Sequence, residues 1–175
     1  RLDRATSGLL MVAKRRSALR MLHELQRDNR IRKRYLALVA GDWPHNRMTV
    51  DVPLRKNTLR GGERIVQADP EGKQALTLFR IKEQFSDSML VEAELKSGRT
   101  HQIRVHAAHL GTPVIGDDKY GDDEINRRYR ALGLKRLFLH AWTLAFEWGA
   151  EGRVLKLTAP LEPVLEQLLT TLRKH

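Results

Sequence analysis

The sequence predicts an α+β fold in which helices flank a mixed, largely antiparallel β-sheet. Segments with strand-like alternation outnumber segments with helical spacing, and several strand candidates follow one another with only a turn between them. A doubly wound parallel sheet would instead separate its strands by helices. At 175 residues the chain is long enough for one domain with a substantial core.

Extended and helical patterns alternate in the first forty residues. Residues 9–13 are an apolar run with the length of a buried strand. Residues 17–25 then repeat apolar side chains at helical spacing, and Ser17 is suited to cap that helix. Residues 32–40 alternate like a strand, which places Tyr35 and every second residue after it on one face.

Turns divide the centre of the chain. Gly61-Gly62 and residues 69–72 are turn sequences, and the short apolar pieces near them fit either brief strands or extended loop. Residues 76–85 and 89–95 flank the sequence Ser-Asp-Ser, and this arrangement predicts a β-hairpin.

The last part of the chain returns to regular patterns. Thr100 is placed to cap a helix that ends before Gly111, because glycine is favoured just past a helix C-terminus. Residues 137–146 and 154–157 are strand candidates, and residues 164–172 form a closing amphipathic helix after a proline.

Basic residues dominate the composition and gather near the start. The chain has 32 lysines and arginines against 21 acidic residues, a net charge of +11, and residues 1–34 hold eleven of the former and three of the latter. Such a surface attracts phosphate backbones by releasing their counterions. A solvated surface or an anionic membrane fits the same balance, so charge favours nucleic acid as the partner without assigning it.

Several function classes lack their sequence signatures. Cysteine is absent, which excludes disulfides and thiolate metal sites and favours the cytosol. No apolar run reaches the roughly 20 residues of a membrane span. The phosphate-loop, dinucleotide and nucleophile-elbow patterns GxxxxGK[ST], GxGxxG and GxSxG do not occur. We expect no metal site, because the helix that carries His106 and His109 offers no carboxylate beside them.

The densest polar cluster is SGRTHQIRVH, residues 97–106. Free N–H groups at the helix start, together with Arg99 and Arg104, would form a site for a phosphate or a carboxylate. Alternatively, Arg104 is a structural arginine paired with a buried acid. The two interpretations merge if that acid is Asp3.

Tyr35 is a second candidate, because it follows Lys33 and Arg34 at the start of a predicted strand. An aromatic ring bordered by cations suits stacking on an unstacked base. A tyrosine at the edge of the core is an equally good interpretation of the same residues.

Four blocks of sequence carry a family resemblance: RLDRATSG, KRYLALVAG, SGRTHQIRVHAAHLGTPVIGDDKYG and RLFLHAWTLAF. In this order they resemble the pseudouridine synthases that modify uridines in large ribosomal RNA and tRNA. The segment PLRKNTLRGGERIVQ resembles one bacterial subfamily that acts on the large ribosomal subunit. The resemblance implies that residues 1–175 are the catalytic domain of that family. It also implies an N-terminal truncation, because the family's upstream strands and small S4-like RNA-binding domain have no counterpart in this sequence.

The resemblance implies roles for five residues. Asp3 matches the family's catalytic aspartate, Tyr35 the tyrosine stacked on the target uracil, and Arg104 the arginine that pairs with the aspartate. Arg1 matches the arginine that helps displace the target base, and Leu139 lies in a block that lines the uracil pocket. Further RNA contacts are predicted at basic residues within or beside the same motifs: Arg4, Lys33, Arg99 and His101.

The implied reaction breaks the N-glycosidic bond of uridine, rotates the uracil and rejoins it through C5. Substrate and product are isomers, so no cofactor is expected. One carboxylate suffices, either attacking the sugar or base or removing a ribose proton, and Arg104 would keep Asp3 ionised. The Tyr35 hydroxyl is a candidate relay for the C5 proton. The target base must flip out of its stem, at a cost of a few kcal/mol.

The favoured function is therefore isomerisation of uridines in large-subunit (23S) ribosomal RNA, either free or in a pre-ribosomal subunit, by a cytoplasmic enzyme. We expect a monomer, since no exposed apolar stripe is evident from the sequence. Two alternatives stay open. One is a non-catalytic RNA-binding or ribosome-assembly module in which Asp3 is only a salt-bridged acid, and the other is an N-glycosidase that releases uracil.

Overall fold

The computed structural model describes residues 1–58 and 62–174. The elements, in chain order, are β1 (Ser7–Gly8), α1 (Arg16–Arg27), β2 (Arg32–Ala40), β3 (Arg47–Asp51), β4 (Leu54–Thr58), β5 (Arg64–Ala68), β6 (Leu76–Gln84), β7 (Ser88–Leu95), α2 (Gln102–His109), α3 (Asp123–Ala131), β8 (Leu139–Trp148), β9 (Arg153–Thr158) and α4 (Pro163–Leu172).

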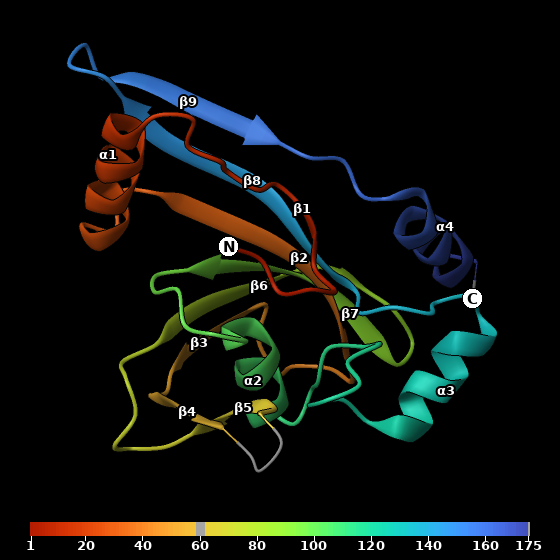
Figure 1. Ribbon diagram of the computed structural model, residues 1–175. Coiled ribbons are helices and arrows are strands. Elements are labelled where there is room, and N and C mark those ends of the chain that lie inside the picture. The colour runs from red at the N-terminus through yellow and green to blue at the C-terminus, as the bar shows by residue number, and fades with distance from the viewer. Residues whose placement is uncertain (59–61, 175) are drawn as a thin grey trace.

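Seven of the strands form one mixed sheet in the order β1-β8-β2-β7-β6-β3, with β9 also paired to β8. Strands β1 and β8 run parallel, and the other pairs in this sheet are antiparallel. Strands β4 and β5 form a separate antiparallel hairpin. In Figure 1, α1 lies beside one end of β8 and β9, whereas α3 and α4 lie near the other end. The predicted α+β fold with a largely antiparallel sheet is confirmed.

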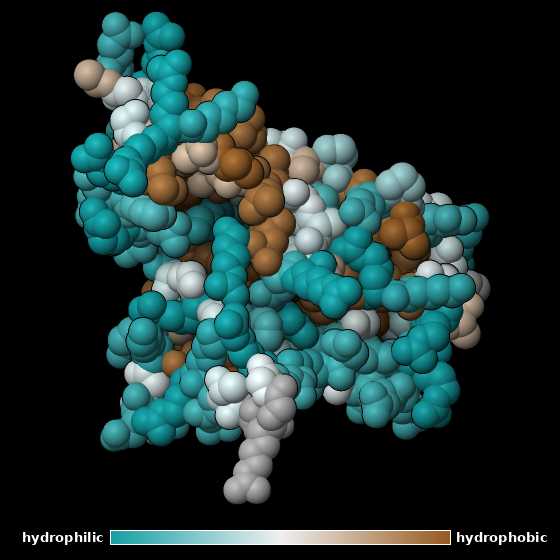
Figure 2. All heavy atoms as spheres, in the orientation of Figure 1, coloured by the Kyte–Doolittle hydropathy of each residue, from teal (hydrophilic) through white to brown (hydrophobic). Residues whose placement is uncertain are grey.

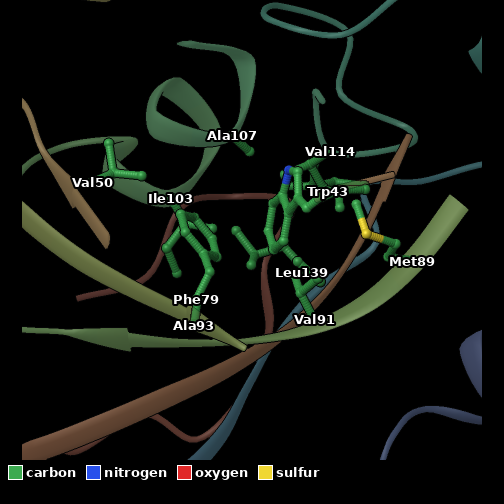
Figure 3. Packing of buried hydrophobic residues seen from close by; sticks show 13 residues of the cluster. Trp43, Val50, Phe79, Met89, Val91, Ala93, Ile103, Ala107, Val114 and Leu139 are labelled. Carbon is green, nitrogen blue, oxygen red and sulfur yellow. The ribbon is translucent and has the colours of Figure 1, made fainter. Parts of the chain in front are cut away.

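Alternate residues of β2 belong to two separate cores. Ala37 and Val39 pack with Ile103 and Ala107 of α2, on the face of the sheet that Figure 3 shows from close by. Leu38 and its neighbours on the opposite face pack with residues of α3 and α4. Because side chains alternate across a strand, β2 supports helices on both faces and holds α2 at a fixed height above the sheet.

Most predicted elements match the structure. The strand at residues 32–40 is confirmed, as are the hairpin of β6 and β7, the strands β8 and β9, and the closing helix α4. The unassigned centre contains β3, β4 and β5, and α3 had no counterpart in the prediction. The predicted turn at Gly61-Gly62 lies partly outside the described residues, since Gly61 is not among them.

Three local predictions are wrong. No strand forms at residues 9–13, because β1 ends at Gly8 and the run continues as extended chain with Leu9 packed on the small core beneath α1. Ser17 does not cap α1, which begins one residue earlier at Arg16. Thr100 does not cap α2, because the residue before that helix is His101 in the left-handed conformation, with φ of 54°.

Several large apolar side chains are exposed on this structure. Figure 2 shows hydrophobic side chains gathered where Figure 1 draws α1, β8 and β9. Val12 is 78% exposed and Val154, on β9, is 70% exposed. We expected a monomer because the sequence showed no exposed apolar stripe. These exposed side chains show that this reason is wrong. Among the described residues, no helix is long and apolar enough to cross a membrane.

Candidate active site

One open cleft brings together eight of the nine predicted site residues. It lies between the N-terminal segment, the start of β2, the loop after β7 and the beginning of α2. The predicted residues that line it are Arg1, Asp3, Lys33, Tyr35, Arg99, His101, Arg104 and Leu139. The exception is Arg4, which is exposed and does not line the cleft.

Asp3 is held at the cleft by a turn and by a short parallel strand pair. The N–H of Thr6 donates to the carbonyl of Asp3 at 3.0 Å, and Ser7 and Gly8 then pair with β8. Gly8 has φ of +104°, and a Cβ there would lie 2.2 Å from the carbonyl oxygen of Ala141. Only glycine therefore allows the backbone to approach β8 this closely.

A buried hydrogen bond fixes the same segment from its side. The Ser7 hydroxyl lies 2.9 Å from Nδ1 of His140, and Nε2 of His140 lies 3.0 Å from the carbonyl oxygen of Ala159. Because a carbonyl only accepts, Nε2 of His140 carries the proton, and Nδ1 accepts from Ser7. His140 thus links the segment that carries Asp3 to the loop after β9.

Arg104 lies near three carboxylates, and the closest one is not Asp3. Its Nε and one terminal nitrogen donate to Asp117 at 2.7 and 2.8 Å, whereas its other terminal nitrogen lies 3.5 Å from Asp3. The side chain of Asp117 is completely buried. Burial acts to raise the pKa of Asp117, but the hydrogen bonds and charge of Arg104 lower that pKa below its usual range. The predicted pairing of Arg104 with Asp3 is therefore a longer contact than its pairing with Asp117, and the exposed Asp118 lies farther still, 3.9 Å from Arg104.

His101 faces Asp3 from the left-handed residue that precedes α2. Its Nε2 lies 3.9 Å from Asp3, and its Nδ1 lies 2.7 Å from the hydroxyl of Tyr120, which also accepts the N–H of Val66 at 2.9 Å. A neutral ring with the proton on Nε2 satisfies both neighbours, since Nδ1 then accepts from Tyr120. Burial lowers the pKa of His101, which favours this neutral form.

The expected anion site at the start of α2 is only partly available. The side chain of Gln102 accepts the N–H of Arg99 at 3.0 Å, so this N–H group is already used. The Arg99 side chain donates to the carbonyl of Gln74 at 2.9 Å while remaining exposed. Arg99 therefore borders the cleft with its charge toward solvent.

Tyr35 and Lys33 form the β2 side of the cleft. Burial, and then the charge of Asp3, raise the pKa of Tyr35 to about 12, so its phenol is neutral at physiological pH. Burial also lowers the pKa of Lys33, and no carboxylate in the described part of the chain pairs with it. The cleft thus offers a lysine amine with no carboxylate partner among the described residues, beside a neutral aromatic ring.

His106, one of the two histidines considered as metal ligands, uses both of its ring nitrogens in hydrogen bonds. Nδ1 of His106 lies 2.8 Å from the hydroxyl of Thr77, and Nε2 lies 2.9 Å from the carbonyl of Val52. Within residues 1–58 and 62–174, no group of three or more histidine or acidic side chains is arranged to hold a metal ion.

Two residues of the site, Asp117 and Tyr120, were missed by sequence reasoning. Both belong to the sequence GDDKYG, which on its own reads as a surface turn. Arg104 could have indicated Asp117, because an arginine on a buried helix requires an acidic partner. Glycine followed by two aspartates offered such an acid thirteen residues later.

Known proteins resemble this chain over nearly its whole length. A family model described as RNA pseudouridylate synthase matches residues 1–109. The chain is 49% identical over 175 residues to a ribosomal large subunit pseudouridine synthase C of Pasteurella multocida (strain Pm70), covering 100% of this chain and 54% of that protein. It is 47% identical to the protein of the same name from Escherichia coli (strain K12), covering 99% of this chain and 55% of that protein. The chain therefore spans about half the length of these curated relatives.

A solved structure has the same fold. Human RNA Pseudouridylate Synthase Domain Containing 1 superposes with a TM-score of 0.79 at 27% sequence identity, covering 100% of this chain and 79% of that one. The sheet and the helices that surround the cleft therefore recur in a distant relative.

Proposed function

The chain belongs to the RNA pseudouridylate synthase family, and on that premise we propose that it isomerises uridines of large-subunit (23S) ribosomal RNA to pseudouridine. The observation that carries the proposal is a carboxylate, Asp3, held 3.5 Å from Arg104 in a cleft bordered by Tyr35. The names of the relatives support the large ribosomal subunit as the source of the substrate.

In the proposed reaction the atoms of the substrate are conserved. The bond between N1 of uracil and C1′ of ribose breaks, the base rotates, and a bond forms between C5 and C1′. The proton on C5 leaves, and one is taken up at N1. Asp3 would start the reaction as a nucleophile or as a base toward the ribose, because its ionised carboxylate is the negative group that faces the cleft beside Arg104.

Tyr35 would act in this reaction as a neutral phenol. With a pKa raised to about 12, it is a poor free base at physiological pH. We infer that the ring borders the uracil together with Leu139, and that its hydroxyl relays the C5 proton by accepting one proton while giving up another. Arg1 would fill the gap that the flipped nucleotide leaves.

The basic residues around the cleft would hold the RNA backbone. Lys33 lies within the cleft with no carboxylate partner in residues 1–58 and 62–174, whereas Arg99 and Arg4 present their charges at the surface. Contacts with phosphates would offset the free energy of base flipping. We further propose that residues 1–175 are the catalytic domain, that RNA alone or a pre-ribosomal subunit is the partner, and that the enzyme is cytoplasmic.

The direct test is to incubate the purified protein with unmodified large-subunit ribosomal RNA and to quantify pseudouridine and free uracil. The proposal predicts pseudouridine at defined uridines with no release of uracil. Release of free uracil would identify an N-glycosidase. Tight RNA binding without either product would identify a binding module.

A further inference from the structure

Asp117 is a buried charge that the proposed reaction does not use. Its side chain has no exposed surface, and both of its carboxylate oxygens are hydrogen-bonded. Arg104 donates two of the bonds, and the N–H groups of Lys119 and Tyr120 donate the others, at 2.9 and 3.1 Å. Burying a carboxylate this thoroughly is costly unless its partners are held in place.

We propose that Asp117 is a positioning residue that holds the guanidinium of Arg104 in the orientation that serves Asp3. This inference rests on the proposed function. A guanidinium is a rigid planar fork, so a two-point grip on Nε and one terminal nitrogen fixes where the remaining nitrogen points. That nitrogen lies 3.5 Å from Asp3.

Asp117 and Asp3 lie at unequal distances from the positive charge of Arg104. Asp117 takes the short contacts of 2.7 and 2.8 Å, and Asp3 takes the single longer one. A charge-assisted hydrogen bond between nitrogen and a carboxylate is normally about 2.7–2.9 Å long. Asp3 therefore lies beside the positive charge of Arg104, yet no short hydrogen bond to Arg104 engages its oxygens. An acid that must attack or deprotonate the ribose needs this freedom.

The loop around Asp117 is built to keep it in place. The side chain of Asn126 donates to the Asp117 carbonyl at 2.8 Å and accepts the N–H of Gly116 at 2.7 Å. A Cβ at Gly121 would lie 2.1 Å from that same carbonyl oxygen, so the turn closes tightly only with glycine there. The ring of Tyr120 also lies against the Arg104 guanidinium, 5.1 Å from its centroid to the Cζ atom.

The first experiment observes Arg104 without using activity. In the nuclear magnetic resonance spectrum of the ¹⁵N-labelled protein, the Arg104 Nε–H should exchange slowly with water because it donates to a buried carboxylate. Asp117→Asn should shift this resonance and speed its exchange. Asp118→Asn is the matched control, because Asp118 is the adjacent acid, its side chain is 98% exposed, and it lies 3.9 Å from Arg104, beyond hydrogen-bond distance. An Arg104 resonance that is unchanged by Asp117→Asn would overturn the proposal.

The second experiment separates positioning from structure. Asp117→Asn keeps the size of the side chain, and we expect kcat to fall about tenfold to a hundredfold with KM unchanged, the scale of a small misplacement in a site. Asp118→Asn should leave both constants within twofold of wild type. A kcat of Asp117→Asn within twofold of wild type, or a change confined to KM, would contradict the proposal.

A further variant covers the case in which Asp117→Asn does not fold. Arg104→Lys keeps the positive charge but cannot form the fork, so it should lower kcat by the same order without removing the charge from the site. Unchanged kcat in Arg104→Lys would show that the two-point grip is not needed. If the wild-type protein forms no pseudouridine, the proposed function fails, while the resonance of Arg104 still reports on the contact with Asp117.

Discussion

Replacing Arg104 by methionine should destabilise the protein in a pH-dependent manner. The change leaves the buried Asp117 carboxylate without its two side-chain bonds, while the N–H groups of Lys119 and Tyr120 still donate to it. Breaking a buried ion pair by removing one partner costs about 3–5 kcal/mol. Because two donors remain, we expect a loss near the lower end, about 3 kcal/mol.

This loss is large enough to measure by thermal unfolding. For a domain of this size, each kcal/mol lowers Tm by about 2–4 °C, so Arg104→Met should melt about 6–12 °C below wild type at pH 7. The matched control is Arg30→Met, because Arg30 pairs with Glu147 at 3.2 Å while both side chains are more than half exposed. An exposed pair contributes about 0–1 kcal/mol, so the control should melt close to wild type.

The pH dependence identifies the unpaired charge as the cause. In the wild type, Arg104 and the backbone donors hold the pKa of Asp117 below its ordinary value, even though burial acts to raise it. Its stabilising contribution is therefore present above the unfolded-state pKa near 3.9 and is lost as pH falls below it. The difference between wild type and Arg104→Met should shrink as Asp117 becomes protonated in acid.

A second substitution completes the test. Asp117→Asn should restore part of the lost Tm in the Arg104→Met background, since it removes the uncompensated charge. Equal melting temperatures for wild type and Arg104→Met at pH 7, or no recovery in the double variant, would refute this account of the buried pair.

Three further outcomes are expected. Gly8→Ala should lower both Tm and pseudouridine formation. A φ of +104° alone costs alanine about 1–2 kcal/mol, and the added Cβ would clash with the Ala141 carbonyl. Full activity with an unchanged Tm would contradict this prediction. Tyr120→Phe should lower the free energy of unfolding in urea by about 1–3 kcal/mol, because His101 and the N–H of Val66 lose the hydroxyl that they share. An unchanged unfolding midpoint would show that the hydroxyl is dispensable. The pKa of Tyr35 is about 12 in the folded protein against about 10 in the unfolded chain, so the free energy of unfolding should fall as pH rises through this range. The fall should be smaller in Tyr35→Phe. Equal pH dependence of the two unfolding free energies would contradict the raised pKa.

Sequence patterns predicted the helices and strands in which buried and exposed side chains alternate with a regular period. The alternation of residues 32–40 predicted β2, because each face of that strand packs against its own core. The run at residues 9–13 has the same apolar character, yet nothing local reveals that only Leu9 and Met11 pack on the core near α1, or that the strand pairing of β1 with β8 ends at Gly8. Pairing between distant strands is a tertiary property, and a short run does not encode it.

The sequence predicted which residues lie in the candidate site better than it predicted which of them contact each other. The resemblance located Asp3, Tyr35 and Arg104, and the fold brings all three to one cleft. Which acid Arg104 grips depends on how the loop after α2 returns to the helix. That path is fixed by contacts such as the one between Asn126 and the backbone of Asp117, which have no periodic signature in sequence.

The Asp3 carboxylate is the group that carries out the proposed isomerisation, so its removal is the most direct test. Asp3→Asn preserves the size of the side chain and removes its charge, and it should be compared with wild type for pseudouridine formation in large-subunit ribosomal RNA and for RNA affinity at the same salt concentration. We expect Asp3→Asn to abolish pseudouridine formation while the RNA affinity stays within a few-fold of wild type. Pseudouridine formation at a rate near that of wild type would contradict it.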